Sequence, residues 1–455
     1  MYGRIARAVV CASLIAVGNV TTAAELPVSA SGATAATLPY GLKAGKPYNG
    51  QTIKVMAVNT PQFVALQKRT QQFTDDTGIV VKWLFVPFGA LQEKVTSVGV
   101  AANGNVDIVN YLDQWGASYA HWLKPLDPLI TQDRFDLADY PPAFLKSVTH
   151  NGKLYGMPVR SNVQMFLYRK DILDALHLKA PRTWQDVISA GPKIRAAYPD
   201  VAPLACYYGA DGNRQNLFVW ADFVRGAGGR ILDDRGYPAW TSPEAMKATR
   251  EYVELYSKHN LCGPGATSNV EQDARIAFQQ GRVAMLPIWQ WAYAAVTNPK
   301  DSILKPEQVG FAPMPAYKPG DPPTTVVNTM PMSISMYSKH KAASWEYLKW
   351  LANPDLDKRN AIERNVDGFA VRNNVVNRWS SLKDPRVNAA NSHVQTAEAE
   401  ALQGNAAPMP EVVYWPEVAD LASIAINQAV SGGDIDTLMR DASERAHLVV
   451  QRELR

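Results

Sequence analysis

The sequence predicts an α/β protein with two domains, and three observations support this. The chain has 455 residues, more than one hydrophobic core usually organises, and its composition, 47% apolar and 19% charged, is that of an ordinary globular protein. From residue 51 onward, β-rich segments alternate with segments of helical periodicity. A second such series begins near Tyr155. This alternation predicts a mostly parallel sheet that helices cover on both faces.

The N-terminal segment has the three parts of a secretory signal. Arg4 and Arg7 supply a positive region, VVCASLIAV is a short apolar run, and TTAA offers small residues for cleavage. We therefore expect residues 1–24 to be a cleaved signal peptide and the mature protein to be periplasmic. Cys11 lies inside the apolar run instead of just after it, so we expect no lipid anchor.

The segment that follows the signal predicts a flexible leader over residues 25–47, because it is rich in Ala, Thr, Ser, Gly and Pro and lacks periodicity. Beyond it, no segment approaches ~18 consecutive apolar residues, the length of a membrane span. Without Arg4 and Arg7, 44 basic residues face 42 acidic ones. This near-neutral balance gives no indication of a nucleic-acid partner.

The first series of elements starts after the leader. TIKVMAV at 52–58, IVVKWLFV at 79–86 and VDIVNY at 106–111 predict three strands. Apolar residues recur at helical spacing between the first two strands, and LQEKVTSVGVAA at 91–102 predicts a second helix. The result is a β-α-β-α-β unit.

Two helices of the second series begin at recognisable caps. Thr183 is followed three residues later by Asp186, the spacing of a capping box. Ser242 precedes Pro243, and proline is favoured at the first helical position. Further on, MPMSISMYS predicts a strand, and KAASWEYLKWLA at 341–352 predicts a helix with one apolar stripe.

Motifs of catalysis and metal binding are absent from the sequence. It contains no G-x-S-x-G elbow, no G-x-x-x-x-G-K phosphate loop and no H-E-x-x-H, and its seven histidines show no ligand spacing. RGAGGR at 225–230 follows a predicted helix, which favours a helix end over a phosphate loop. TQDRFDLAD at 131–139 lacks the glycine and terminal glutamate of a calcium loop. We expect no enzyme activity, metal or cofactor.

Two cysteines, Cys206 and Cys262, remain after cleavage of the signal. They would lie in a compartment where disulfides persist, so a disulfide is one interpretation. Two separate buried thiols are the other.

Several stretches, in order, resemble one protein family over nearly the whole mature chain. They are VDIVNYLDQWGASYAHWLKPLDPLI, NGKLYGMPVRSNVQMFLYRKDIL, PRTWQDV, ARIAFQQGRVAM and SKHKAASWEYLKWLANPD followed by DGFAVR. No single stretch is diagnostic, but their order and spacing are similar to those of the family-1 extracellular solute-binding proteins of ABC importers. The resemblance is closest to sugar and sugar-alcohol receptors, which include relatives of the maltose-binding protein.

The resemblance implies a type II periplasmic binding protein fold, in which two α/β lobes are joined by a hinge and hold a ligand in the cleft between them. Crossings between the lobes are expected near residues 157–162, 327–332 and 367–372. The expected lobes are therefore discontinuous, the N-terminal one comprising 48–160 and 330–368 and the C-terminal one 161–329 and 369–455.

The resemblance also implies a function. The protein would capture a sugar or polyol as a monomer and deliver it to the membrane permease subunits of an ABC importer. A secreted glycoside hydrolase is the alternative from another class, although neighbouring acids such as Asp75 and Asp76 are most often solvated surface. The same fold could hold an oligosaccharide or glycerol phosphate, but only Arg160 and Arg214 offer basic groups near the expected cleft. This scarcity favours a neutral solute.

Two tryptophans, Trp289 and Trp291, follow a predicted strand at its carboxyl end, where open α/β sheets bind ligands. Flat apolar rings suit the C–H faces of a sugar. In an extended segment both rings would face one side, whereas in a helix they would diverge. Packing within the lobe core is the alternative for either ring.

Polar ligand contacts are expected where strands end and where the chain crosses between lobes. Asn59 and Asp113 each follow a strand, although each could instead cap the next helix. Arg160 and Asn162 lie at the first crossing, and a salt bridge between the lobes is the alternative role of Arg160.

Three further residues complete the predicted site. Asn213 lies in the polar loop GADGNRQN and Asn328 lies at the second crossing, and turn formation is the alternative for both. Trp415 lies in a region that supplies a late aromatic platform in maltose-type receptors, with core packing as its alternative.

Overall fold

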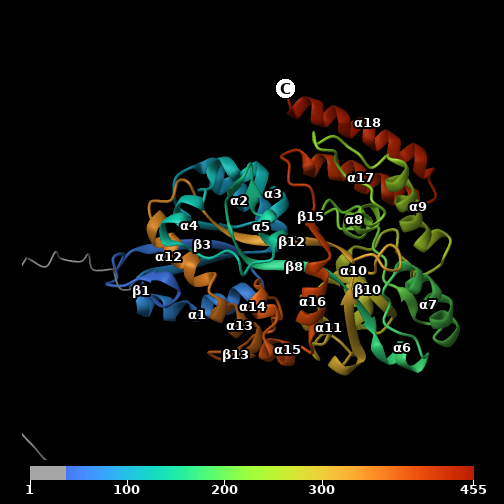
Figure 1. Ribbon diagram of the computed structural model, residues 1–455, viewed down its shortest axis with the longest axis horizontal. Helices are drawn as coiled ribbons and strands as arrows, with labels where there is room; N and C mark the ends of the chain where they lie inside the picture. The colour runs from blue at the N-terminus through green and yellow to red at the C-terminus, as the bar shows by residue number, and fades with distance from the viewer. Residues whose placement is uncertain (1–36) are drawn as a thin grey trace, which may run out of the picture. The chain divides into compact units, whose positions relative to one another are not determined.

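One sheet of nine strands runs through the part of the chain that the computed structural model describes, residues 37–455 (Figure 1). The predicted signal peptide and residues 25–36 of the predicted leader lie outside these residues. Seven strands form the main order, and two more pair with its central members. In spatial order the seven are β4 (Val80–Val86), β3 (Thr52–Val58), β5 (Ile108–Asn110), β12 (Thr324–Ile334), β8 (Met157–Arg169), β10 (Val283–Trp289) and β9 (Ala202–Leu204), while β11 (Val309–Pro313) pairs with β8 and β15 (Asn405–Pro408) with β12.

The pairing within this sheet is mixed. β3 runs parallel to β4 and β5, β9 runs parallel to β10, and β15 runs parallel to β12. In contrast, β8 is antiparallel to β12, β10 and β11, and β12 is antiparallel to β5. The prediction of a mostly parallel sheet is therefore wrong at the centre of the sheet. There, two long strands pass between lobes instead of returning through a helix, and antiparallel pairing needs no such crossover.

β8 and β12 join two lobes, each with its own hydrophobic core. On β8, Val159 belongs to one buried cluster and Val163 to the other, and on β12 Met330 and Val327 divide in the same way. Figure 1 shows the first lobe on the left, around β3, and the second on the right, around β10. The two predicted α/β lobes are therefore present, and two strands cross between them side by side.

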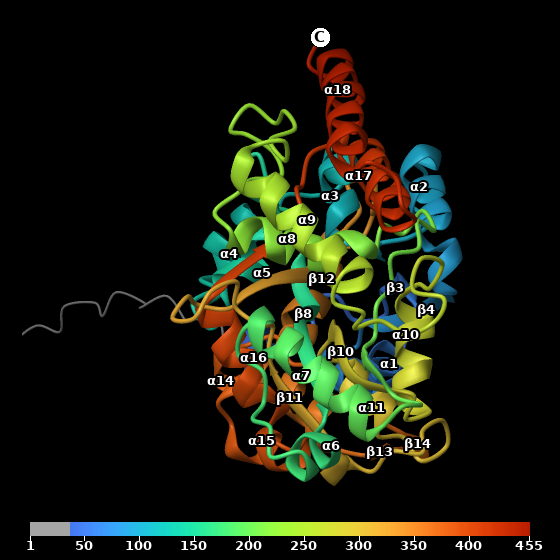
Figure 2. The ribbon, with the colours of Figure 1, turned by 90° about the vertical axis from the view of Figure 1, so that its right-hand side faces the viewer.

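Helices lie on both sides of the sheet in each lobe, as predicted. In Figures 1 and 2, α2 (Leu91–Ala101) and α3 (Asp113–Tyr119) lie above the strands of the first lobe and α1 (Pro61–Thr77) lies below them. No helix of residues 37–455 is both long and apolar enough to cross a bilayer. The other helices are α4 (Asp127–Asp133), α5 (Pro142–Lys146), α6 (Lys170–Ala175), α7 (Trp184–Ala197), α8 (Asn216–Gly226), α9 (Pro243–Ser257), α10 (Glu271–Gln279), α11 (Ala292–Val296), α12 (Lys341–Leu351), α13 (Pro354–Ile362), α14 (Trp379–Leu382), α15 (Pro385–Ala390), α16 (Val394–Gln403), α17 (Trp415–Val430) and α18 (Ile435–Glu453).

Local signals in the sequence place several of these helices. Thr183 Oγ1 accepts the backbone N–H of Asp186 at 3.1 Å, and the Asp186 carboxylate accepts the Thr183 N–H at 2.9 Å, which confirms the capping box of α7. Ser242 caps α9, with Pro243 at its first position. α8 ends within RGAGGR, where Gly228 has a left-handed φ of 83°, so the prediction of a helix end is confirmed.

Replacement of Thr183 by alanine is expected to lower the free energy of unfolding by about 1 kcal/mol, because the substitution leaves an N–H of the first turn of α7 without its acceptor. Chemical denaturation of the purified protein measures the change. Thr183→Ser keeps the hydroxyl and serves as the control, so equal stability of the alanine and serine variants would contradict the role of the cap.

Cys206 and Cys262 form a disulfide, with their Cα atoms 5.4 Å apart. The bond joins the chain just after β9 to the loop after α9. Of the two alternatives that the sequence left open, pairing is the one observed. The cross-link holds the edge strand of the second lobe, since β9 is the last strand in the sheet order.

Candidate functional site

Polar side chains cover one face of the crossing strands. Arg160, Asn162 and Gln164 alternate along β8 and therefore share a face. The register places Asn328 of β12 directly opposite Asn162, and Trp289 of β10 directly opposite Gln164. Paired residues of neighbouring strands project to the same side, so these five residues form a single patch between the lobes.

Asp113 extends this patch from the first lobe. It is 1% exposed at the start of α3, and its carboxylate accepts Asn328 Nδ2 at 2.6 Å and the backbone N–H of Thr329 at 2.7 Å. Asn328 Oδ1 in turn accepts Asn162 Nδ2 at 3.2 Å. Burial raises the pKa of Asp113 to about 7, although its hydrogen bonds act in the opposite direction.

Several buried acceptor oxygens near this patch lack a hydrogen-bond partner within residues 37–455. They are Asn162 Oδ1, Gln164 Oε1 and one carboxylate oxygen of Glu411. Burial, together with the nearby Asp113 carboxylate, raises the pKa of Glu411 well above its usual range, although the charge of Lys146 acts in the opposite direction. Because a buried acceptor without a donor costs about 1–3 kcal/mol, these atoms indicate a place for a ligand that supplies hydroxyl or ammonium donors.

Trp289 lies at the back of the patch and is held there. It is 6% exposed, its Nε1 donates to Glu271 Oε2 at 2.8 Å, and its ring meets that of Phe218 edge-on at a centroid distance of 5.0 Å. Burial raises the pKa of Glu271 to about 7, while the Trp289 bond and the charges of Arg275 and Arg160 lower it. Most of the indole therefore belongs to the core of the second lobe.

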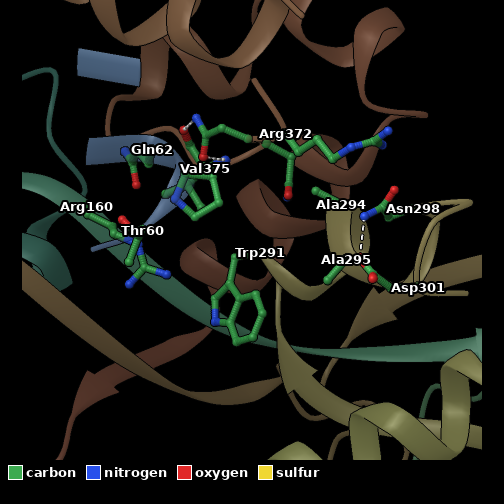
Figure 3. Close-up of a pocket in the computed structure, with 13 residues that line it drawn as sticks. Thr60, Gln62, Arg160, Trp291, Ala294, Ala295, Asn298, Asp301, Arg372 and Val375 are labelled. Carbon is green, nitrogen blue, oxygen red and sulfur yellow. Dashed lines mark hydrogen bonds between the residues drawn. The ribbon is translucent and has the colours of Figure 1, made fainter. Parts of the chain in front are cut away.

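Trp291 points elsewhere, into a cavity of about 220 Å³ (Figure 3). The cavity is lined from the first lobe by Thr60 and Gln62 at the start of α1, and from the second lobe by Trp291 and by Ala294 and Ala295 of α11. Figure 3 shows the indole between Arg160 on one side and Ala295 on the other. The two tryptophans diverge because β10 ends at Trp289 and Trp291 is already the N-cap residue of α11.

Arg160 connects the cavity to the polar patch. Its side chain lines the cavity, and its Nη1 lies 2.8 Å from Met330 Sδ on β12. Desolvation lowers the pKa of Arg160 to about 10, and the Glu271 carboxylate acts in the opposite direction. A solute in the cavity would therefore meet one indole face, the Arg160 guanidinium and the side chains of Gln62 and Asn374, whose amide oxygens are buried without a hydrogen-bond partner in residues 37–455.

Three of the nine predicted site residues lie apart from this arrangement. Asn213 is exposed and bonds only within its own loop, its Nδ2 donating to Asp211 at 2.8 Å. Asn59 is exposed at the end of β3, next to Thr60, but does not line the cavity. Trp415 is 1% exposed in the core of the second lobe, so its ring offers no surface to a solute in this arrangement. The other six fall into two groups that share Arg160: Asp113, Asn162, Trp289 and Asn328 lie with it in the patch, and Trp291 lines the cavity with it.

The structure also adds residues that the sequence did not predict for the site. Gln164 could have been found, because it continues the alternation of Arg160 and Asn162 along one strand. Gln62, Glu271 and Glu411 carry no such signal, since each reaches the site from a distant part of the chain. Arg214, considered as a basic group near the cleft, instead pairs with Asp420 at 2.7 Å.

Comparison of the sequence with known proteins gives consistent matches. A family model described as bacterial extracellular solute-binding protein matches residues 57–358. A probable amino-acid ABC transporter periplasmic-binding protein of Sinorhizobium fredii is 26% identical over 407 residues, covering 87% of each chain. The mannitol-binding protein of Pseudomonas aeruginosa is 23% identical over 324 residues, covering 70% of this chain and 72% of that protein.

Solved structures match over the same extent. An ABC transporter solute-binding protein of Agrobacterium vitis with bound D-mannitol has a TM-score of 0.68 and 26% identity, covering 89% of this chain and 98% of that one. The maltose-bound MalE3 of T. maritima has a TM-score of 0.74 and 24% identity, covering 88% and 99%. These matches confirm the predicted fold class, a type II periplasmic binding protein with two lobes.

Proposed function

This chain belongs to the family of bacterial extracellular solute-binding proteins, and we propose that it is the periplasmic receptor of an ABC importer for a sugar or sugar alcohol. One observation carries the proposal: the Trp291 indole lines a cavity between side chains of both lobes, among them Gln62 and Asn374, whose buried amide oxygens lack a hydrogen-bond partner in the described part of the chain. The similar proteins whose names or bound ligands include mannitol support the same class of solute.

The chemistry of the site suits a polyhydroxyl solute. An indole gives the C–H face of a sugar or polyol a flat apolar surface. The amide oxygens of Gln62 and Asn374 would accept hydroxyl protons, and Arg160 would donate to hydroxyl oxygens. The cavity of about 220 Å³ combines the Trp291 ring with polar side chains from both lobes, a lining that can orient a small ligand.

The mechanism we propose is closure of the lobes around the solute. β8 and β12 are the connections that would bend, because they are the strands that pass from one hydrophobic core to the other. A solute that touches Gln62 on one lobe and Trp291 on the other binds the closed form better, and this difference in affinity populates it. The closed receptor then docks, as a monomer, on the permease and releases the solute unaltered.

A ligand screen tests this function. Purified protein is heated with D-mannitol, ribitol, maltose and a set of amino acids, and the melting temperature is recorded, because a ligand that binds the native state raises it. We expect at least one polyol or sugar to raise it, and mass spectrometry to recover that compound unchanged. A rise with amino acids alone would contradict the proposed solute class, and turnover of a sugar would contradict a transport function.

A further inference from the structure

A second cavity, of about 360 Å³, adjoins the first. The two cavities share Ala294 of α11 and Arg372, a residue of the segment that follows β14 (Phe369–Ala370). Figure 3 shows the guanidinium of Arg372 extending away from Trp291. Arg364, Tyr293 and Ser392 also line the second cavity.

Two arginines give the second cavity positive charge, and the nearby carboxylates are those of Asp301, at the adjoining cavity, and Glu307, which acts on Tyr293. Arg364 and Arg372 line it, and its lining, drawn from the described residues 37–455, includes no aspartate or glutamate. Neither arginine forms an ion pair within those residues. The pKa of Arg364 is lowered by desolvation and by the like charge of Arg372. Two guanidinium groups held together at such a site lower the free energy of binding an anion.

Neutral groups hold Arg364 in position. Its Nη1 donates to the carbonyl oxygen of Asn373 at 3.0 Å, and its Nη2 donates to the carbonyl oxygen of Ala390 at 2.6 Å and to Asn391 Oδ1 at 2.7 Å. These bonds fix the guanidinium and leave its charge unpaired. They use both Nη2 protons and one Nη1 proton, so the Nε–H and the second Nη1–H remain as donors to an oxyanion.

A hydroxyl donor completes the site. The Tyr293 hydroxyl donates to Ser392 Oγ at 2.5 Å, so the Ser392 proton is free to donate to a ligand. Ser392 has a left-handed φ of 53°, which is uncommon outside glycine and is found more often at functional positions.

We propose that the second cavity binds a small oxyanion, a phosphate or carboxylate group, through Arg364, Arg372 and Ser392. The anion is either a free ion or an anionic substituent of the solute in the first cavity, since Arg372 borders both. The free-ion case is independent of the proposed sugar-receptor function, whereas the substituent case rests on it.

Calorimetry with inorganic phosphate at low ionic strength tests the site. We expect Arg372→Gln to weaken phosphate binding at least tenfold, because it removes one of the two guanidinium groups. Arg372 is the decisive position, because within residues 37–455 its replacement breaks no hydrogen bond that holds the surrounding chain. Replacement of Arg364 would break three such hydrogen bonds. Arg235→Gln, which removes an exposed arginine from a turn in the second lobe, is the matched control and should bind as the wild type does.

A second arm separates the two sources of the anion. If the anion belongs to the solute, D-mannitol 1-phosphate binds more tightly than D-mannitol, and Arg372→Gln removes the difference. If the anion is free, phosphate binds whether or not D-mannitol is present, and the two polyols bind alike. The proposal is overturned if the wild-type protein binds neither phosphate nor D-mannitol 1-phosphate. It is also overturned if wild type and Arg372→Gln bind these ligands equally well. If the wild-type protein binds phosphate but no polyol or sugar, only the proposed sugar specificity is overturned.

Discussion

Trp291→Ala is expected to weaken the binding of D-mannitol, or of the best ligand in the screen, by about tenfold to a hundredfold. The indole is the largest apolar surface in the first cavity, and its loss removes both the buried area and the stacking contact with the C–H face of the solute. Each tenfold step corresponds to about 1.4 kcal/mol of binding free energy. Isothermal titration calorimetry measures the change directly.

Two further variants sharpen this experiment. Trp291→Phe keeps a flat ring and should retain most of the affinity. Trp289→Ala should instead lower the melting temperature of the unliganded protein, because the Trp289 ring packs in the core and its Nε1 bonds Glu271. The sequence left open whether both indoles or only one would face the cleft. The end of β10 at Trp289 and the N-cap position of Trp291 at the start of α11 separate their roles. Wild-type affinity in Trp291→Ala would remove the stacking contact from the proposal.

The elements that the sequence predicted well are those specified by residues close together along the chain. The capping box of α7 needs only Thr183 and Asp186, and the end of α8 needs only the glycines of RGAGGR. The antiparallel centre of the sheet has no such local signature. Its pairing follows from two strands that cross between lobes, and residues more than 160 positions apart, such as Asn162 and Asn328, define it.

The same distinction between local and long-range determinants applies to the residues of the candidate site. Arg160, Asn162 and Asn328 could be predicted because the crossing strands themselves carry them. Trp415 could not be placed from the sequence, because a tryptophan at the start of a helix can face either the cleft or the core, and α17 turns this one into the core. Arg364 and Arg372 lie eight residues apart on neither a helix nor one strand, so only the folded chain shows that they share a cavity.

Glu271→Gln is expected to stabilise the unliganded protein at pH 8 by an amount on the order of 3 kcal/mol, and to change its stability little at pH 5. Burial raises the pKa of Glu271 from 4.5 to about 7, so the native state binds a proton that the unfolded state has lost between those values. The contribution of this group is therefore most favourable at low pH and is lost as the pH rises through about 7. Glutamine imitates the protonated acid and can still accept the Trp289 N–H.

Urea denaturation of both proteins across this pH range measures the difference. Glu444→Gln, at an exposed glutamate of α18, is the control and should follow the wild type at every pH, because the substitution changes no buried group. At neutral pH the buried Glu271 carboxylate therefore destabilises the unliganded protein. A destabilising polar group is expected at a binding site, where side chains are arranged to contact a ligand rather than one another. If Glu271→Gln and wild type show the same pH dependence, the carboxylate is hydrated in the unliganded protein and burial does not raise its pKa.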